Sequence, residues 1–171
     1  GSNGMKGSVP TEIFTLPNLV HLKLYGNDVD VEFTGIENAR KLQKLGLDDT
    51  GLKSLDGVGK ARSLVELNAG YNKLTGELPE ELSRLINLES FDISHNKLSG
   101  PLPSWLRNLV VLQSFSASHN NFSGPVSDFA THSKLSYLDL SYNQFEGNVP
   151  STLLAGSPPD DKVVVDLSHN K

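Results

Sequence analysis

The chain has 171 residues, of which 37% are hydrophobic, and this is enough to build the core of one folded domain. Its 20 acidic residues outnumber the 15 basic ones, and no basic run is present, so nucleic acid is not an expected partner. The absence of cysteine excludes disulfides and thiolate chemistry. The apolar runs are too short to cross a bilayer, so we expect membrane contact only through regions absent from this chain.

A nine-residue phrase, Leu-x-x-Leu-x-Leu-x-x-Asn, repeats along the chain and is clearest at residues 19–27 and 135–143. The positions that end the phrase are Asn3, Asn27, Thr50, Asn72, Asn96, Asn120, Asn143 and Asn170. Their spacing predicts seven coils, at about residues 3–26, 27–49, 50–71, 72–95, 96–119, 120–142 and 143–169. We therefore expect a single repeat domain over residues 1–171, truncated at both ends and part of a longer array.

The segments between these phrases differ along the chain. The first, fourth, fifth and seventh coils carry a second phrase, Asn-x-φ-x-Gly-x-φ-Pro with φ apolar, in which glycine permits a sharp turn and proline fixes the next segment. The second coil has Gly35 but lacks this phrase, and the third is shorter, with Leu52 and Leu55 ahead of Gly57. The last coil contains an insertion at residues 155–161. The convex side is therefore expected to be less regular than the strands.

The alternation within each Leu-x-Leu predicts a short strand with one buried face, and stacked coils would share one continuous core. The asparagine that follows can satisfy backbone groups that the bend leaves unpaired, so its repetition predicts an internal hydrogen-bond ladder. The expected ladder residues are Asn27, Asn72, Asn96, Asn120, Asn143 and Asn170. We expect a weaker rung at Thr50, because threonine is too short to replace asparagine fully.

The two phrases together resemble the plant-type leucine-rich repeat of receptor-like proteins, receptor kinase ectodomains and inhibitors of cell-wall-degrading enzymes. The resemblance covers essentially the whole chain. It implies an α/β-type repeat fold: a right-handed solenoid with a concave parallel β-sheet, about seven coils and little helix. It also implies an extracellular or cell-surface location.

No sequence motif indicates catalysis, and neither a catalytic residue nor a cofactor is expected. The segment Gly57-Val58-Gly59-Lys60 faintly resembles a phosphate loop. However, Ser54 stands where the first glycine of such a loop belongs, and Ala61 where a hydroxyl must hold the metal ion. We therefore expect a binding protein rather than an enzyme.

Residues that alternate with the buried leucines should point out of the concave sheet and stack in columns about 4.8 Å apart. The column before the asparagine ladder is rich in Tyr and His, and a column within the strands is rich in Asp. We predict partner binding at Tyr71, Asp92, His95, His119, Asp139 and Tyr142. This acidic groove with aromatic anchors would suit a peptide with basic residues or a glycan. The alternative is that these residues only keep an exposed sheet soluble.

Other single positions carry weaker signals. His95 and His119 on adjacent coils could respond to pH or hold a metal, but two solvated histidines make a poor site, so no metal is expected. Trp105 falls on the convex return, where packing over the neighbouring coil is favoured over anchoring a partner. Asn121-Phe122-Ser123 is a sequon, so Asn121 is an expected glycosylation site.

The resemblance implies recognition of a protein, peptide or glycan ligand on the concave face by an extracellular receptor-like protein. Two alternatives stay open: a structural or adhesive cell-surface repeat protein, and an inhibitor of a wall-degrading enzyme. If the concave face binds, changes at Tyr71 and Tyr142 should abolish binding, whereas a convex change such as Glu81→Ala should leave it intact.

Overall fold

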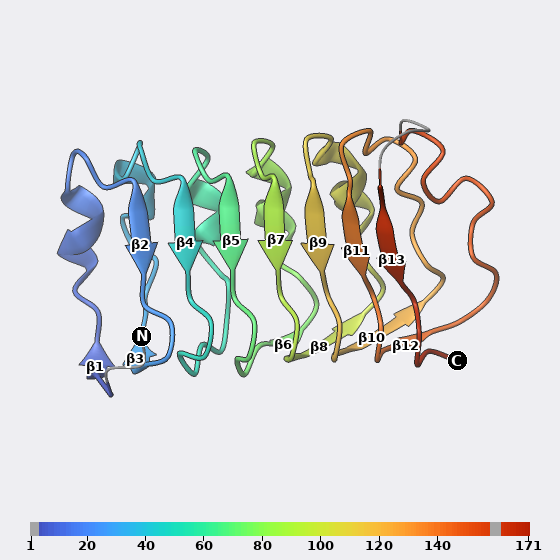
Figure 1. Cartoon of the computed structure of the whole chain (residues 1–171). Coiled ribbons are helices and arrows are strands. Elements are labelled where there is room, and N and C mark those ends of the chain that lie inside the picture. Colours follow the sequence, from blue (N-terminus) through green and yellow to red (C-terminus); the bar gives the residue numbers. More distant parts are fainter. Residues whose placement is uncertain (1–3, 158–161) are drawn as a thin grey trace.

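A computed structural model of the chain, which describes residues 4–157 and 162–171, is a row of stacked coils (Figure 1). Each coil contributes one short strand to the same face. The seven strands pair in parallel in the order β13-β11-β9-β7-β5-β4-β2. Their bounds are β2 His21–Lys23, β4 Lys44–Gly46, β5 Glu66–Asn68, β7 Ser90–Asp92, β9 Ser114–Ser116, β11 Tyr137–Asp139 and β13 Val164–Asp166. The predicted leucine-rich-repeat solenoid with a concave parallel sheet is confirmed.

Further short strands lie along the edge that follows the concave sheet. One four-stranded sheet runs β12-β10-β8-β6, and β1 pairs with β3. Their bounds are β1 Lys6–Ser8, β3 Asp28–Asp30, β6 Thr75–Gly76, β8 Lys97–Gly100, β10 Asn121–Gly124 and β12 Gln144–Phe145. Asn3 and residues 158–161 of the insertion lie outside the described residues.

The convex side is built from 3₁₀ segments, in agreement with the expectation of little helix. They are η1 Thr11–Thr15, η2 Ile36–Asn38, η3 Val58–Lys60, η4 Glu80–Arg84 and η5 Ser104–Asn108. None of the helical segments in the described ranges is long and apolar enough to span a bilayer.

One hydrophobic core runs through the stack. The middle residues of successive strands, such as Leu67, Phe91 and Phe115, pair in register and are fully buried. Trp105 on η5 is only 4% exposed, so its ring packs into this core, and the packing interpretation is confirmed. Because each coil covers its neighbours, burial of these side chains stabilises the stack as a whole.

The asparagine ladder connects each coil to the one before it. The Asn96 amide nitrogen donates to the carbonyls of Ile93 and Ser94 in its own coil and to that of Ala69 in the preceding coil. Its carbonyl oxygen accepts a hydrogen bond from the Leu74 backbone N–H at 3.0 Å. The other predicted ladder asparagines likewise accept a backbone N–H from the preceding coil.

Thr50 occupies the irregular rung. Its hydroxyl donates to Leu47 of its own coil at 2.8 Å, and no side-chain bond from it to the preceding coil is present among the described residues. Asn72 makes the regular ladder bond to the Leu47 carbonyl, and its oxygen accepts the Thr50 backbone N–H in addition to that of Leu52. The rung therefore has fewer bonds toward the first coil, as the short side chain predicts.

Gly59 owes its identity to close packing between η3 and η4. A Cβ atom at this position would lie 2.2 Å from the Glu81 carbonyl oxygen. In addition, the Glu81 carboxylate accepts a hydrogen bond from the Gly57 backbone N–H. The glycine-rich segment is thus a contact between neighbouring coils. Glu81 was expected to be a free convex side chain, but this bond makes it an unsuitable control for binding studies.

The asparagine ladder makes a testable prediction about stability. Asn96→Ala removes the amide that joins the two coils and leaves the Leu74 backbone N–H inside the stack unpaired, so it should lower the free energy of unfolding by about 1–3 kcal/mol. Urea melts measure this, with the exposed Asn148→Ala as the matched control. Equal melts for the two variants would show that the ladder does not stabilise the stack.

Candidate functional site

The residue before each ladder position adopts a left-handed backbone conformation. The φ angles of Tyr71, His95, His119, Tyr142 and His169 lie between 52° and 55°. Such a conformation costs a non-glycine residue about 1–3 kcal/mol, and the hydrogen-bonded bend around the asparagine holds it in place. Because every coil repeats the same conformation at the same point, these side chains project in the same direction.

The rings of these five residues form one continuous column, which we call the ring stack. Tyr71 lies on His95 with ring centroids 4.0 Å apart, and His95 lies on His119 at 4.1 Å. Tyr142 continues the column, 4.1 Å from His119 and 4.0 Å from His169. The planes of neighbouring rings differ by 7° to 13°. The predicted aromatic column is therefore a rigid wall along the later coils.

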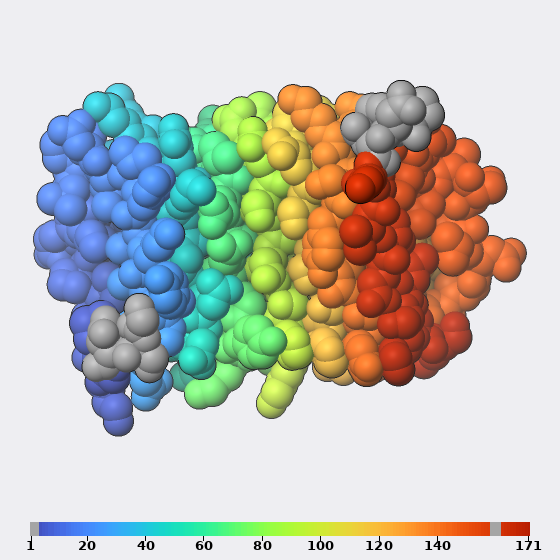
Figure 2. All heavy atoms as spheres, viewed as in Figure 1, coloured from blue at the N-terminus to red at the C-terminus, as the bar shows by residue number. Residues whose placement is uncertain are grey.

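A groove of about 510 Å³ runs beside the ring stack on the concave face. Figure 2 shows the side of the molecule that carries the seven strands in space-filling form. Tyr71 and His95 line one side of the groove, and the carboxylates of Asp48, Asp92 and Asp139 line the sheet. Four of the six predicted binding residues thus meet in one groove. The other two, His119 and Tyr142, extend the wall beyond it.

The aspartates of the groove have a structural role that the sequence analysis missed. One carboxylate oxygen of Asp92 accepts the Ser94 backbone N–H at 2.8 Å. Asp139 accepts both the backbone N–H and the hydroxyl of Ser141, at 3.0 and 2.6 Å. Asp92 and Asp139 therefore each fix the end of their own strand with Oδ1, and Oδ2 takes no part in this turn. The Oδ1 atom of Asp48 instead accepts the Gly70 backbone N–H of the next coil.

Negative charge accumulates in the groove. Burial raises the pKa of Asp48, and the nearby carboxylates of Asp92 and Glu66 raise it further, against the lowering effect of a hydrogen bond from the Gly70 backbone N–H. The Tyr137 hydroxyl donates to Asp139 at 3.4 Å, and burial together with this carboxylate raises the pKa of the phenol. A positively charged group would relieve this concentration of carboxylates.

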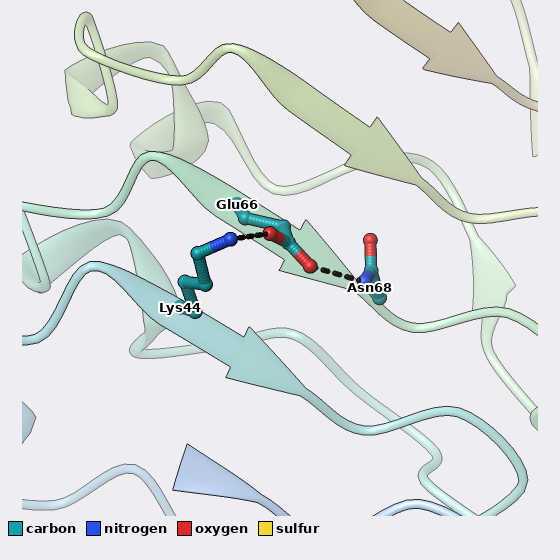
Figure 3. A network of polar contacts seen from close by, with 3 residues as sticks. All are labelled: Lys44, Glu66 and Asn68. Carbon is teal, nitrogen blue, oxygen red and sulfur yellow. Dashed lines mark hydrogen bonds and ion pairs between the residues drawn. The ribbon is translucent and has the colours of Figure 1, made fainter. Parts of the chain in front are cut away.

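An ion pair joins β4 and β5 on the concave face, and Figure 3 shows it in detail. Lys44 on β4 donates to the Glu66 carboxylate on β5 at 2.7 Å, and Asn68 donates to the other oxygen of Glu66 at 2.9 Å. The bond from Lys44 holds the pKa of Glu66 below its ordinary value. This contact marks the end of the groove and leaves Lys23 on β2 as a further cation on the same face.

Tyr137, Lys44 and Glu66 were not among the predicted site residues. They occupy the position before the buried middle residue of each strand, whereas the predicted site residues all lie after it. The alternation of a strand places both flanking residues on the same outer face, so this rule alone could have found them.

The ring geometry argues against metal binding by His95 and His119. In stacked rings, the nitrogen lone pairs lie in nearly parallel planes and do not converge on one ion. No group of three or more potential metal ligands occurs within residues 4–157 and 162–171. The sequon residue Asn121 is exposed on β10, two residues after His119.

Comparison with known proteins agrees with this geometry. The Leucine Rich Repeat family model matches residues 63–85, 87–109 and 134–155. The chain carries leucine-rich repeats in these three segments. A curated relative, Receptor-like protein 35 of Arabidopsis thaliana, is 34% identical over 93 residues, which is 54% of this chain.

Solved structures of leucine-rich-repeat proteins superpose on almost the whole chain. A TDR receptor is 31% identical, with a TM-score of 0.85 over 96% of this chain. The Arabidopsis receptor kinase HAESA, solved with the peptide hormone IDA and the co-receptor SERK1, is 30% identical, with a TM-score of 0.80 over 96%. A plant ice-binding protein is 27% identical, with a TM-score of 0.76 over 96%. The chain spans 8% of the curated relative and 29%, 28% and 54% of these three chains.

The ring stack predicts an unusual titration of His95. Partial burial and the neighbouring His119 lower the pKa of His95, against the raising effect of Asp92 and Asp139. The neutral ring is therefore favoured in the folded state. The neutral His95 ring contributes fully to the free energy of unfolding above the pKa that His95 has in the unfolded chain. This contribution is lost as the pH falls through the lower pKa of His95 in the folded chain.

An NMR titration of the imidazole signals should show a pKa for His95 below the ordinary value of 6.5. His119→Asn removes the neighbouring positive charge and should raise the pKa of His95. A pKa of His95 at or above the ordinary value in the unaltered chain would contradict the stacked arrangement.

Proposed function

We propose that this chain recognises a peptide, or an extended segment of a partner protein, as part of an extracellular receptor-like protein. The observation that carries the proposal is the ring stack bordering a groove lined with carboxylates. Stacked rings offer contact area that loses little conformational freedom on binding, and carboxylates select cationic groups. The similarity to HAESA, whose structure holds a peptide hormone, supports the same type of ligand.

The distribution of charge on the sheet suggests how such a ligand lies. Lys23 and Lys44 are on the first two strands, whereas Asp92, Asp139 and Asp166 are on later ones. A segment that crosses the strands would place a positive residue over the later coils and a negative residue over the first ones. The proposal therefore predicts the sign of the ligand charges and the order in which they lie across the strands.

The repeat fold alone does not decide between the proposed function and its alternatives. A plant ice-binding protein shares the coil architecture, so the proposal rests on the side chains of the groove and not on the fold. A wall-enzyme inhibitor or an adhesive spacer would be favoured if these side chains proved irrelevant to binding.

The proposal predicts which substitutions abolish binding. Short peptides selected against the chain from a random display library should be enriched in Lys and Arg. The double variant Tyr71→Ala/Tyr142→Ala should weaken their binding by about tenfold or more, because it removes two rings from the wall. Isothermal titration calorimetry measures this loss.

The matched control is Glu80→Ala, an exposed position on the convex segment η4. Thermal melts should be similar for the control and the double variant, because Tyr71 and Tyr142 are exposed. Peptides that bind the double variant as tightly as the unaltered chain, but lose affinity for the Glu80 variant, would rule out the concave groove as the binding surface.

A further inference from the structure

A second hollow, of about 600 Å³, lies on the convex side, at the ends of η2, η3 and η4. Four cationic residues from three successive coils line it: Arg40, Lys60, Arg62 and Arg84. We call them the basic cluster. All four side chains are exposed, and none of them lines the concave groove.

The basic cluster is not neutralised by the part of the chain that the structure describes. The ion pair found there, Lys44 with Glu66, belongs to the concave face, and no cation of the cluster pairs with a carboxylate in the described ranges. One carboxylate, that of Glu37, lines the hollow. Four positive charges and one negative charge give +3, whereas the whole chain carries −5. Such a concentration of like charge attracts an anion.

Other cations on the same side of the molecule are engaged by the protein. Lys41 donates to the Asn18 side chain at 2.8 Å, and Arg107 donates to the Ser104 carbonyl at 2.9 Å. By contrast, no hydrogen bond from the side chains of the basic cluster occurs within residues 4–157 and 162–171. Their guanidinium and ammonium donors are therefore available to a ligand.

The helix dipole does not explain the cluster. A cation in the last turn of a helix is favourable, and this applies to Lys60 on η3 and Arg84 on η4. However, Arg40 and Arg62 follow the C-caps Ala39 and Ala61 and lie outside the helical segments. The helical segments also have only three to five residues, so their dipoles are small.

The lining of the hollow indicates the type of anion. Ser63 and Asn87 lie beside the cations and offer polar groups to hydroxyls, whereas Ile36, Ala39 and Ala61 are 0–2% exposed and present no apolar surface. The planar fork of arginine matches oxyanions with two parallel hydrogen bonds. Cations on three successive coils can reach anionic groups on successive sugars.

We propose that the basic cluster binds an anionic oligosaccharide, whose rings carry sulfate or carboxylate groups. This site is separate from the concave groove and does not depend on the function proposed for it. The two faces together would let the chain hold a charged glycan while it recognises a cationic ligand on the other side.

The test measures binding of three oligosaccharides of similar length by calorimetry at low salt: a heparin-derived one, an oligogalacturonate and a neutral maltooligosaccharide. The two anionic sugars separate sulfate from carboxylate recognition. We expect at least one of them to bind and the neutral sugar not to bind. Arg40→Gln/Arg62→Gln should weaken binding by about tenfold or more, since each arginine can make charge-assisted hydrogen bonds.

A charge-matched control separates a specific site from general attraction. Lys97→Gln/Lys134→Gln removes the same charge from exposed positions outside the hollow and should change the affinity by less than about twofold. Glu37→Gln should strengthen binding, because it removes the carboxylate of the hollow. The proposal is overturned if neither anionic sugar binds, or if the two double variants weaken binding equally. Circular dichroism of each variant confirms that the coils are intact.

Discussion

The structure depends on the hydrogen bonds that asparagine side chains make between successive coils. Asn120, for example, donates to Ile93 in the preceding coil and accepts from the Leu98 backbone N–H. A buried amide that satisfies groups on both coils fixes their separation and their register together. The hydrophobic effect drives the stacking, but leucine packing alone tolerates small slips that these directional bonds do not.

The surface features follow from this fixed register. Because the bend before each asparagine is the same, the rings of Tyr71, His95 and His119 meet face to face. On the convex side, the same repetition brings Arg40 and Arg62 to neighbouring coils around one hollow. The asparagine ladder therefore arranges both the ring stack with its carboxylates and the basic cluster. The side chains of both surfaces lie outside the core.

Structural features that recur in every coil could be predicted from the sequence. Single contacts between residues of different repeat positions could not. The strands, the asparagine ladder and the aromatic column follow from periodicity, which fixes both spacing and direction. The bond from Gly57 to Glu81 depends on how convex segments of unlike sequence approach each other, which no period encodes. His132 is another example: it takes a leucine position in the core, where its Nε2 lies 3.0 Å from the Leu106 carbonyl oxygen. Arg40, Arg62 and Arg84, by contrast, recur every 22 residues, so the repeat does contain the basic hollow, although it was not predicted.

The candidate site was predicted in outline but not in chemistry. The sequence placed Asp92 and Asp139 on the concave face, and the structure shows that each also closes its own strand end. A backbone N–H at the strand end and a group of the ligand would compete for the same carboxylate oxygen. The alternation of residues along a strand does not predict such a bond. Tyr137 was not predicted, because the chosen site residues all lie after the middle residue of each strand.

The central claim is that the regular columns of the concave face form the ligand-binding surface. A crystal structure of the chain with a display-selected peptide tests this claim most directly. The account predicts that the peptide crosses β5, β7, β9 and β11 beside the ring stack, with a cationic side chain near Asp92 or Asp139. A peptide seated on the convex segments η2 to η5, with the ring stack left open to solvent, would contradict it.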